Sequence, residues 1–420
     1  MRAGRRELIR DLNRALVLNL VRDSEGLSRA DVARVSGLSP STVTAITASL
    51  LDDGYLLEDD PTASEPPVKG PIGRPATMLR VHPAAGHAIG IKVSKDNLTA
   101  AVTDLTAALL GMATVPRGNA NDAGAVGDLF ESVVSEALRA AGVSRDRLVG
   151  IGIGVPGIVD PETRRVADSP LLEWAHIDLV ALLRERLALP VLLDNDVNTL
   201  TIAQQLFGAG RGLPHFLVVT IGRGIGMGVV VNGVVHRGSR GGAGEIGHVQ
   251  AVPNGPDCWC GRRGCLEAVA AEPALVREIL ASTGRLVQPA EIAAFANRDS
   301  DVAEILARAG RHVGRAVAAI TTVLDPQRVV ISGEGVRLGD HYLTAVRAEL
   351  SEREQKEAPT EIVIEPWGDE AWARGAATLV LREVFHPAHL RDEEAPTSAR
   401  SERVNPIPTK TARSGRGGYR

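Results

Sequence analysis

The first 58 residues have a pattern of hydrophobic and polar positions that is typical of three short helices separated by turns. Leucines recur at helical spacing in the first segment, and similar apolar stripes follow in the next two. The expected helices end at Gly26, Gly37 and Gly54, because glycine adopts the left-handed conformation that stops a helix. Ser28 and Ser39 are suitable N-caps for the second and third helices.

A different pattern begins after these helices. Residues 55–58 and 76–82 predict two short strands, which together would form a two-stranded wing. From residue 88, strands alternate with helices, starting with strands over 88–94 and 98–104 and a helix over 125–141. The alternation repeats coarsely after residue 215. We therefore expect an α/β body of two similar lobes that face a cleft.

The third helix is a candidate for reading DNA, because a recognition helix presents short polar side chains opposite its buried stripe. With Val43, Ile46 and Leu50 inside, the other face remains for DNA. The expected DNA contacts are Arg29, Ser39, Ser41, Thr42, Thr44, Ala45 and Thr47, with Arg74 suited to a narrow minor groove. The alternatives are a three-helix packing element without a nucleic-acid role and, around Arg74, a simple linker turn.

Composition limits the class of protein. The 420 residues suggest two or three domains, and 47 basic against 51 acidic residues give a net charge of -4, which excludes a wholly basic nucleic-acid coat. A small DNA-binding module on a larger acidic body remains compatible with that charge. No run approaches the length of about 18 apolar residues that a membrane span requires. We expect a cytoplasmic protein with no membrane partner.

All three cysteines lie close together after a histidine. Cys258, Cys260 and Cys265 follow His248 in GHVQAVPNGPDCWCGRRGC, so a disulfide framework is excluded and a reducing compartment is favoured. One imidazole and three thiolates form a closed tetrahedral donor set, which predicts one structural Zn²⁺ per chain. A catalytic zinc is disfavoured because no coordination position stays open, and the alternative is three incidental free thiols.

Polar side chains gather in three otherwise apolar segments: LLDNDVN, GAGEIGH and GCLEA. Carboxylates and amides that converge at a cleft suit a polyol, because each oxygen accepts from neighbouring hydroxyls. The alternative is that Asp194 and Asp196 only cap a turn after the strand. The polar side chains of these segments are Asp194, Asn195, Asp196, Asn198, Glu245, His248 and Glu267.

These segments resemble the ROK family of bacterial sugar-responsive repressors and sugar kinases, specifically the repressor branch with an N-terminal winged helix. The resemblance covers about residues 5–385, and its most specific segment is GEIGHVQAVPNGPDCWCGRRGCLEA, followed by DNDVN and GVPGIVD. It implies a winged helix-turn-helix followed by a two-lobed, actin-like or hexokinase-like ATPase fold. Asn195 and Asp196 match the family's sugar-binding pair, and Asp196 also matches the kinases' catalytic base. The resemblance implies that Glu245, His248 and Glu267 make the remaining sugar contacts, so these five residues are the sugar-binding candidates.

The resemblance also implies domain boundaries. Residues 1–82 would be the DNA-binding domain. Residues 86–196 together with 370–386 would form the first lobe, and 197–369 the second lobe with its zinc loop. Residues 390–420, which end in a basic stretch rich in Pro, Gly, Ser and Thr, are expected to be a disordered tail.

The chain departs from the kinases where they bind nucleotide. Family kinases carry an Asp-x-Gly-Gly-Thr run at the first strand, but GIKVSKDNL places Lys92 at the acid and Ser94 and Asp96 near the phosphate position. Lysine cannot ligate magnesium, and side chains crowd the space that a phosphate needs. Arg223 and Glu334 likewise alter the two nucleotide-side glycine loops. The resemblance therefore implies a retained sugar site beside a lost ATP site.

Three functions remain open at this point. The leading interpretation is a non-enzymatic repressor that a monosaccharide releases from an inverted-repeat operator in double-stranded DNA. It would act as a homodimer or homotetramer, because one winged helix reads only a half-site. The second is a sugar kinase with a DNA-binding head, against which Lys92 stands. The third is a constitutive DNA-binding protein, against which the intact sugar-binding set stands.

Overall fold

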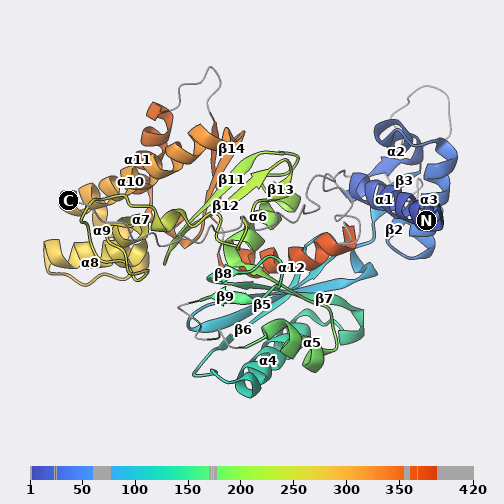
Figure 1. Cartoon of the computed structure of the whole chain (residues 1–420), viewed down its shortest axis with the longest axis horizontal. Helices are drawn as coiled ribbons and strands as arrows, with labels where there is room; N and C mark the ends of the chain where they lie inside the picture. The colour runs from blue at the N-terminus through green and yellow to red at the C-terminus, as the bar shows by residue number, and fades with distance from the viewer. Residues whose placement is uncertain are drawn as a thin grey trace, which may run out of the picture.

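The structure, a computed structural model, has a small helical head and two larger lobes (Figure 1). It describes residues 2–22, 24, 26–59, 77–169, 172, 174, 177–353, 360–366 and 368–385. Arg74 and the expected tail over 390–420 lie outside these ranges. Within them, no helix is both long and apolar enough to cross a membrane.

The head has the expected order of three helices and a wing. Its elements are α1 (Arg2–Arg22), β1 (Leu27–Ser28), α2 (Arg29–Ser36), α3 (Pro40–Asp52), β2 (Leu56–Glu58) and β3 (Met78–Val81). Both expected caps form: Ser28 Oγ accepts from the Asp31 N–H at 3.1 Å, and Ser39 Oγ accepts from the Thr42 N–H at 3.2 Å. The wing has one strand more than expected, because the two-residue β1 pairs with β3 to give the order β1-β3-β2.

The first lobe contains a five-stranded sheet in the order β10-β7-β4-β5-β6. Its elements are η1 (Pro83–Ala85), β4 (His87–Val93), β5 (Asn97–Asp104), β6 (Leu109–Pro116), α4 (Ala123–Ala141), η2 (Arg145–Arg147), β7 (Leu148–Val155), β8 (Ile158–Val159), β9 (Val166–Asp168), α5 (Leu179–Leu187) and β10 (Val191–Asn195). β10, β7 and β4 run parallel, whereas β5 and β6 are antiparallel to their neighbours. Helices α4 and α5 cover one face of this sheet (Figure 1).

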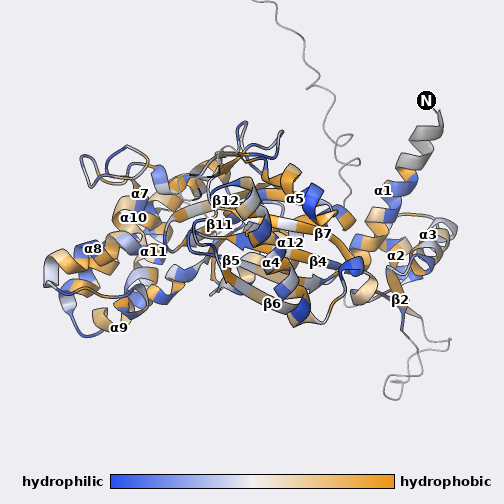
Figure 2. Ribbon diagram, turned by 90° about the horizontal axis from the view of Figure 1, so that it is seen from below, coloured by the Kyte–Doolittle hydropathy of each residue, from blue (hydrophilic) through white to orange (hydrophobic). Residues whose placement is uncertain are grey.

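The second lobe contains a sheet in the order β13-β12-β11-β14-β15. Its elements are β11 (Phe216–Ile221), β12 (Ile225–Val231), β13 (Val234–Val235), η3 (Ile246–His248), α7 (Leu266–Ala270), α8 (Glu272–Thr283), η4 (Pro289–Glu291), α9 (Ile292–Ala296), α10 (Ser300–Leu324), β14 (Arg328–Ser332), η5 (Glu334–Leu338), α11 (Asp340–Arg353) and β15 (Glu361–Ile364). Figure 2 shows that strands of both sheets are largely hydrophobic, as buried strands between helices must be.

Two helices, α6 (Asp196–Phe207) and α12 (Asp369–Phe385), lie between the lobes. α12 packs directly on β4 and β7, where Gly90 and Gly152 leave room for it: a Cβ at either glycine would lie 1.9 Å from an α12 carbonyl oxygen. Leu200 of α6 and Trp372 of α12 share a buried cluster with Phe216 of the second sheet. The two lobes therefore meet at α6 and α12, and the expected fold class is confirmed.

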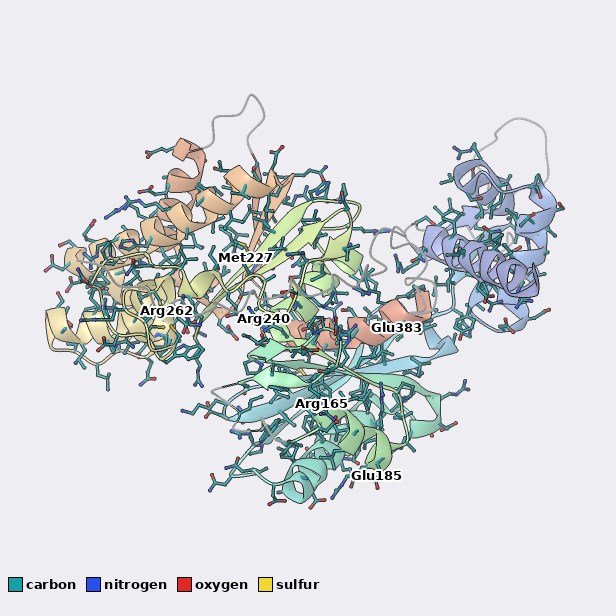
Figure 3. The ribbon with its side chains drawn as sticks, in the orientation of Figure 1. Arg165, Glu185, Met227, Arg240, Arg262 and Glu383 are labelled. Atoms are coloured by element: carbon teal, nitrogen blue, oxygen red, sulfur yellow. The ribbon has the colours of Figure 1, made fainter. Side chains whose placement is uncertain are left out.

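The C-terminal end of α12 joins the head. Asn19 Nδ2 donates to the Phe385 carbonyl oxygen at 2.9 Å, and the Arg22 guanidinium lies 4.7 Å from the centroid of the Phe385 ring. Leu381 and Phe385 belong to the same hydrophobic core as the buried residues of α1 and α3. Figure 3 labels Glu383 at this end of the helix, next to the head. Helix α12 thus runs from its position between the lobes to the head, and it packs against both.

Candidate functional site

The exposed face of α3 carries most of the expected DNA contacts. Ser41, Thr44 and Ala45 are exposed, Ser39 is exposed at the cap, and Thr42 is half-buried. The opposite stripe, Val43, Ile46 and Leu50, is buried as expected. Ser39 Oγ hydrogen-bonds with the hydroxyls of Ser41 and Thr42, and the face contains the short side chains that a major groove admits.

Thr47 does not belong to that face, and its assignment as a DNA contact is wrong. Its side chain is fully buried, because a helix stripe that includes Val43 and Ile46 also includes the position four residues after Val43. Arg29 Nε donates to Thr47 Oγ1 at 3.1 Å, and the same guanidinium pairs with Glu58. These contacts connect α2, α3 and the wing, so Arg29 has a packing role in the head.

The histidine and the three cysteines come together in one cluster. The donor atoms of His248, Cys258, Cys260 and Cys265 all lie within 4.8 Å of one another. Cys258 Sγ is 3.6 Å from His248 Nδ1, and Cys260 Sγ is 3.7 Å from Cys265 Sγ. A disulfide requires about 2.05 Å between sulfurs. Two sulfurs about 2.3 Å from a tetrahedral zinc lie about 3.8 Å apart, which fits.

The loop around this cluster is folded tightly enough to hold an ion. Gly264 has φ 69°, and a Cβ there would lie 1.7 Å from the Val252 carbonyl oxygen. Burial raises the pKa of the Cys258 thiol to about 12, so this sulfur needs a nearby cation to remain a thiolate. Hydrogen bonds from Arg262 outweigh burial at Cys260 and lower its pKa to about 7. The donor set and the loop both fit structural zinc.

A cavity of about 600 Å³ opens between the lobes beside this cluster. The five sugar-binding candidates line it together, although they come from three separate segments of the chain. Asn195 and Asp196 lie where β10 passes into α6, Glu245 precedes η3 and His248 is its last residue, and Glu267 lies in α7. The carboxyl end of a strand next to a helix N-terminus is a common place for a ligand in α/β proteins.

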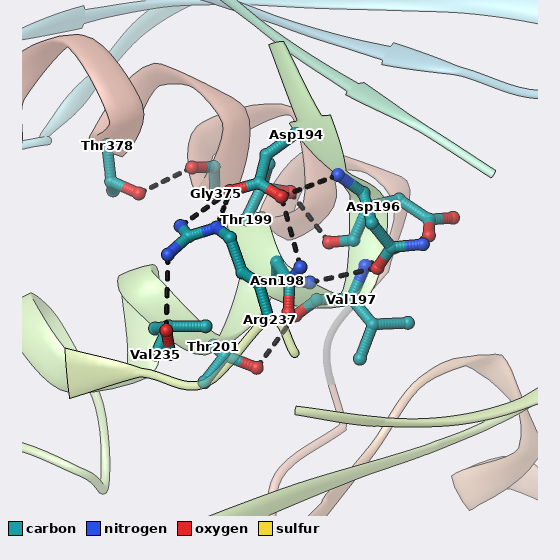
Figure 4. A network of polar contacts seen from close by, with 11 residues as sticks. Asp194, Asp196, Val197, Asn198, Thr199, Thr201, Val235, Arg237, Gly375 and Thr378 are labelled. Carbon is teal, nitrogen blue, oxygen red and sulfur yellow. Dashed lines mark hydrogen bonds and ion pairs between the residues drawn. The ribbon is translucent and has the colours of Figure 1, made fainter. Parts of the chain in front are cut away.

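A buried ion pair fixes the start of α6, as Figure 4 shows. The Asp194 carboxylate accepts from Arg237 Nε at 2.8 Å and Nη2 at 2.6 Å, and from Asn198 Nδ2 at 3.0 Å. Asn195 caps the helix by accepting from the Asn198 N–H at 3.1 Å, and its Nδ2 donates to the Gly157 carbonyl oxygen at 3.0 Å. Asp194 is therefore structural, while Asn195 both caps the helix and faces the cavity.

Asp196 occupies the first position of α6, at the cavity wall. One carboxylate oxygen accepts from the Val197 N–H at 2.9 Å. Burial raises the pKa of Asp196 to about 7, against the opposing attraction of the Lys92 ammonium. The charge of the Asp196 carboxyl group therefore changes near neutral pH, and this change would alter how it binds a hydroxyl-rich ligand.

Glu267 shows a contact that the sequence analysis missed. One of its oxygens accepts from the Ile225 N–H at 3.2 Å, and the other accepts from the indole N–H of Trp259. The Trp259 ring also stands edge-on to His248, with centroids 4.7 Å apart and planes at 80°. The sequence signal that could have pointed to this contact is the position of Trp259 between two candidate metal-binding cysteines.

The residues that depart from the kinase pattern line the same cavity and pair across it. Lys92 Nζ of β4 lies 3.1 Å from Glu334 Oε1 of η5, and 4.8 Å from the centroid of the Trp372 ring. Arg223 Nη2 lies 3.1 Å from Asp96 Oδ2, which forms a second ion pair across the cleft. The departures noted in the sequence thus pair with one another.

Comparisons with known proteins give a consistent result. The model of the ROK family matches residues 88–383, and a winged helix-turn-helix DNA-binding model matches residues 10–56. The DNA-binding transcriptional dual regulator NagC of Escherichia coli (strain K12) is 29% identical over 398 residues, with 91% of this chain and 95% of NagC covered. The xylose repressor of Bacillus subtilis (strain 168) is 27% identical over 375 residues, with 89% and 96% covered.

Solved structures support the same assignment. A ROK family transcriptional regulator, a homologue of the E. coli MLC protein, has a TM-score of 0.76 at 23% identity, with 90% of this chain and 97% of that chain covered, and so shares the fold. The ROK hexokinase from Thermus thermophilus is 32% identical, with a TM-score of 0.61. The match covers 71% of this chain and 99% of the hexokinase chain. The chain belongs to the ROK family and is homologous to its transcriptional regulators, with a winged helix-turn-helix ahead of the ROK domain.

Proposed function

We propose that the protein is a transcriptional repressor that leaves its operator when a monosaccharide or sugar derivative binds between the lobes, and that it does not phosphorylate the sugar. One observation carries this proposal. The sugar-binding candidates line one cavity, and the residues that replace the kinases' nucleotide-side groups form ion pairs across the same cavity. The curated relatives named above are a transcriptional regulator and a xylose repressor.

The nucleotide side lacks the groups that phosphoryl transfer needs. Transfer from ATP depends on a cation that bridges phosphates and on a loop that admits them. Lys92 stands at the position of the magnesium-binding acid, and its ammonium pairs with the Glu334 carboxylate. That carboxylate reaches the glycine-rich loop, where a Cβ on Gly222 would lie 2.5 Å from Glu334 Oε2. A triphosphate would have to displace this pair.

The metal cluster would support the sugar site. His248, Cys258, Cys260 and Cys265 would hold zinc, which supplies a structural cross-link between η3 and the start of α7. His248 Nδ1 faces the thiol of Cys258, so Nε2 is the nitrogen left for a sugar hydroxyl. The same loop carries Glu245 and Glu267, so three of the five sugar candidates depend on its fold.

Helix α12 is the route by which the sugar site would act on the head. Its Trp372 lines the cavity, and its last residue, Phe385, packs against α1. About 13 residues of helix separate the two, a distance of about 20 Å. A sugar that favours one arrangement of the lobes shifts the head only by its differential affinity for the two states. Lobe closure that changes the separation of two heads in a dimer would remove both from their half-sites.

The head should bind an inverted repeat, and Ala45 should lie at the centre of the α3 face that contacts DNA. Ala45→Glu places a carboxylate on the exposed face of α3 against the phosphates and base edges. We expect specific operator affinity, measured by titration of a labelled duplex, to fall by about 10-fold to 100-fold.

A matched control is Ala281→Glu, which makes the same change at an exposed position of α8, far from the head (Figure 1). This variant should bind the operator as the wild-type protein does. Footprinting of the wild-type protein should protect a two-fold symmetric site. Equal binding by the two variants, or protection without two-fold symmetry, would contradict the DNA-binding part of the proposal.

The whole proposal is tested by a sugar panel followed by two assays. A sugar that is present at 100 times its Kd stabilises the folded protein by about 2.7 kcal/mol, which a thermal shift detects. The stabilising sugar should then lower operator affinity by about 5-fold to 150-fold. ATP with the same sugar should give no sugar phosphate. Turnover would restore the kinase interpretation, and unchanged operator affinity at saturating sugar would leave a constitutive DNA-binding protein.

A further inference from the structure

The cavity has an aromatic wall whose role the sugar candidates do not explain. Trp259 lines the cavity and is 61% exposed, although a large aromatic side chain is ordinarily buried. Its neighbours in sequence, Cys258 and Cys260, are two of the four metal-binding candidates. The side chain therefore projects from the metal loop into the sugar site.

The backbone around Trp259 is held in place on both sides. The Cys258 N–H donates to the Arg262 carbonyl oxygen at 2.8 Å, and the Gly261 N–H donates to the Cys258 carbonyl oxygen at 3.0 Å. Asp257 and Arg263 form a β-bridge at the base of this short hairpin. The indole can consequently move by rotation of its side chain while the loop stays fixed.

Trp259 contacts two of the five sugar candidates at once. Its ring stands edge-on to His248, and its N–H donates to Glu267. The other Glu267 oxygen already accepts from the Ile225 N–H at 3.2 Å. Both oxygens of Glu267 are thus engaged within the protein, and a sugar hydroxyl that binds the Trp259-side oxygen must compete with the indole.

We propose that Trp259 is a gate and a specificity-determining wall of the sugar site. Without sugar, its N–H covers Glu267; when a sugar hydroxyl takes that oxygen, the indole turns away and packs its ring against the apolar C–H face of a pyranose. The ring supplies a large, rigid apolar surface, which favours a cyclic sugar over an open-chain polyol. This inference rests on the proposed function and adds the class of ligand to it.

Two substitutions at this position should act in opposite directions. Trp259→Ala removes the wall and should weaken sugar binding about tenfold, as loss of an aromatic anchor usually does. Trp259→Phe keeps a ring but removes the N–H, so no hydrogen bond to Glu267 must be broken. It should bind sugar about 2-fold to 10-fold more tightly. A purely structural role of Trp259 would weaken binding in both variants.

The experiment measures Kd for D-glucose, D-xylose and N-acetyl-D-glucosamine by calorimetry on the full-length protein, with D-glucitol as the open-chain comparison. Arg263→Ala is the matched control, because Arg263 lies in the same hairpin and its exposed side chain forms an ion pair with Asp257. Metal content and sugar-free operator binding should stay at wild-type levels in all three variants. The wild-type protein should bind at least one cyclic sugar, and D-glucitol more weakly.

The outcomes separate this inference from the proposed function. Wild-type protein that binds none of the sugars would overturn the proposed function, and the gate with it. Wild-type binding that persists unchanged in Trp259→Ala, or that weakens equally in Trp259→Phe, would overturn the gate alone. A Kd for D-glucitol equal to that of the cyclic sugars would overturn the pyranose wall.

Discussion

Cys258→Ser is expected to release the metal and to abolish the sugar response while operator binding by the head is retained. Serine is a poor zinc ligand, and loss of one donor from a four-donor site opens it to water. We expect metal content to fall at least about tenfold. Glu245, His248 and Glu267 lie on or beside this loop, so sugar affinity should fall with it. The core of the head is shared with the end of α12 and lies apart from the metal loop, and both helix caps of the head are local.

Elemental analysis of the purified protein gives the first measurement, with about one zinc per chain expected for the wild type. Sugar-induced thermal shift and operator titration follow, before and after treatment with a chelator. The control is again Arg263→Ala, which leaves all four donors in place. Wild-type protein with less than about a tenth of an ion per chain would refute the zinc assignment. A normal sugar response in metal-free protein would refute its supporting role.

The features that the sequence predicted well are those whose signal is local. The caps at Ser28 and Ser39 needed only a hydroxyl next to an apolar stripe. The candidate metal cluster could be predicted because its three cysteines lie in one short segment, and the structure brings their thiols together with His248. Local hydrogen bonds and closely spaced ligands depend little on the rest of the fold, so a sequence pattern suffices for them.

The predictions failed where contacts with other parts of the fold determine burial or strand formation. Thr47 is polar, but its position in the helical stripe and its contact with Arg29 bury it. β6 was also missed; it is the edge strand of its sheet, and its positions alternate between half-buried and exposed along most of its length. The two-residue β1 is recognisable only through its pairing with β3.

For the sugar and nucleotide sides of the cleft, the sequence predicted which residue types are present but not how they are arranged in space. Which carboxylates face each other depended on the family resemblance, since the segments are far apart in the chain. Lys92 and Glu334 are 242 positions apart, so no spacing rule links them. The sequence identified both as departures from the kinases, and the fold added that they pair. The domain boundaries and the site residues other than Thr47 stay predictions.

Asp196→Ala is expected to give a repressor that binds its operator and no longer responds to sugar. Asp196 lies at the cavity wall and at the start of α6, which packs on α12. Sugar binding at its carboxylate would therefore act on the helix that reaches the head. A carboxylate that accepts from two hydroxyls contributes about 1.5–3 kcal/mol for each charged hydrogen bond. Loss of both should weaken sugar binding by about 100-fold or more. The measurement is operator affinity against sugar concentration, with sugar-free affinity as the check on folding.

The pH dependence supplies an independent test of the same carboxylate. Its pKa is raised to about 7, so Asp196 is largely protonated at pH 6 and largely ionised at pH 8. If the ionised form accepts the sugar hydroxyls, sugar affinity should increase about tenfold between these two values. Asp196→Asn keeps the shape but cannot ionise, so its weaker binding should be independent of pH over this range. A wild-type affinity that is flat from pH 6 to pH 8, or a pH profile that Asp196→Asn preserves, would show that another group holds the sugar.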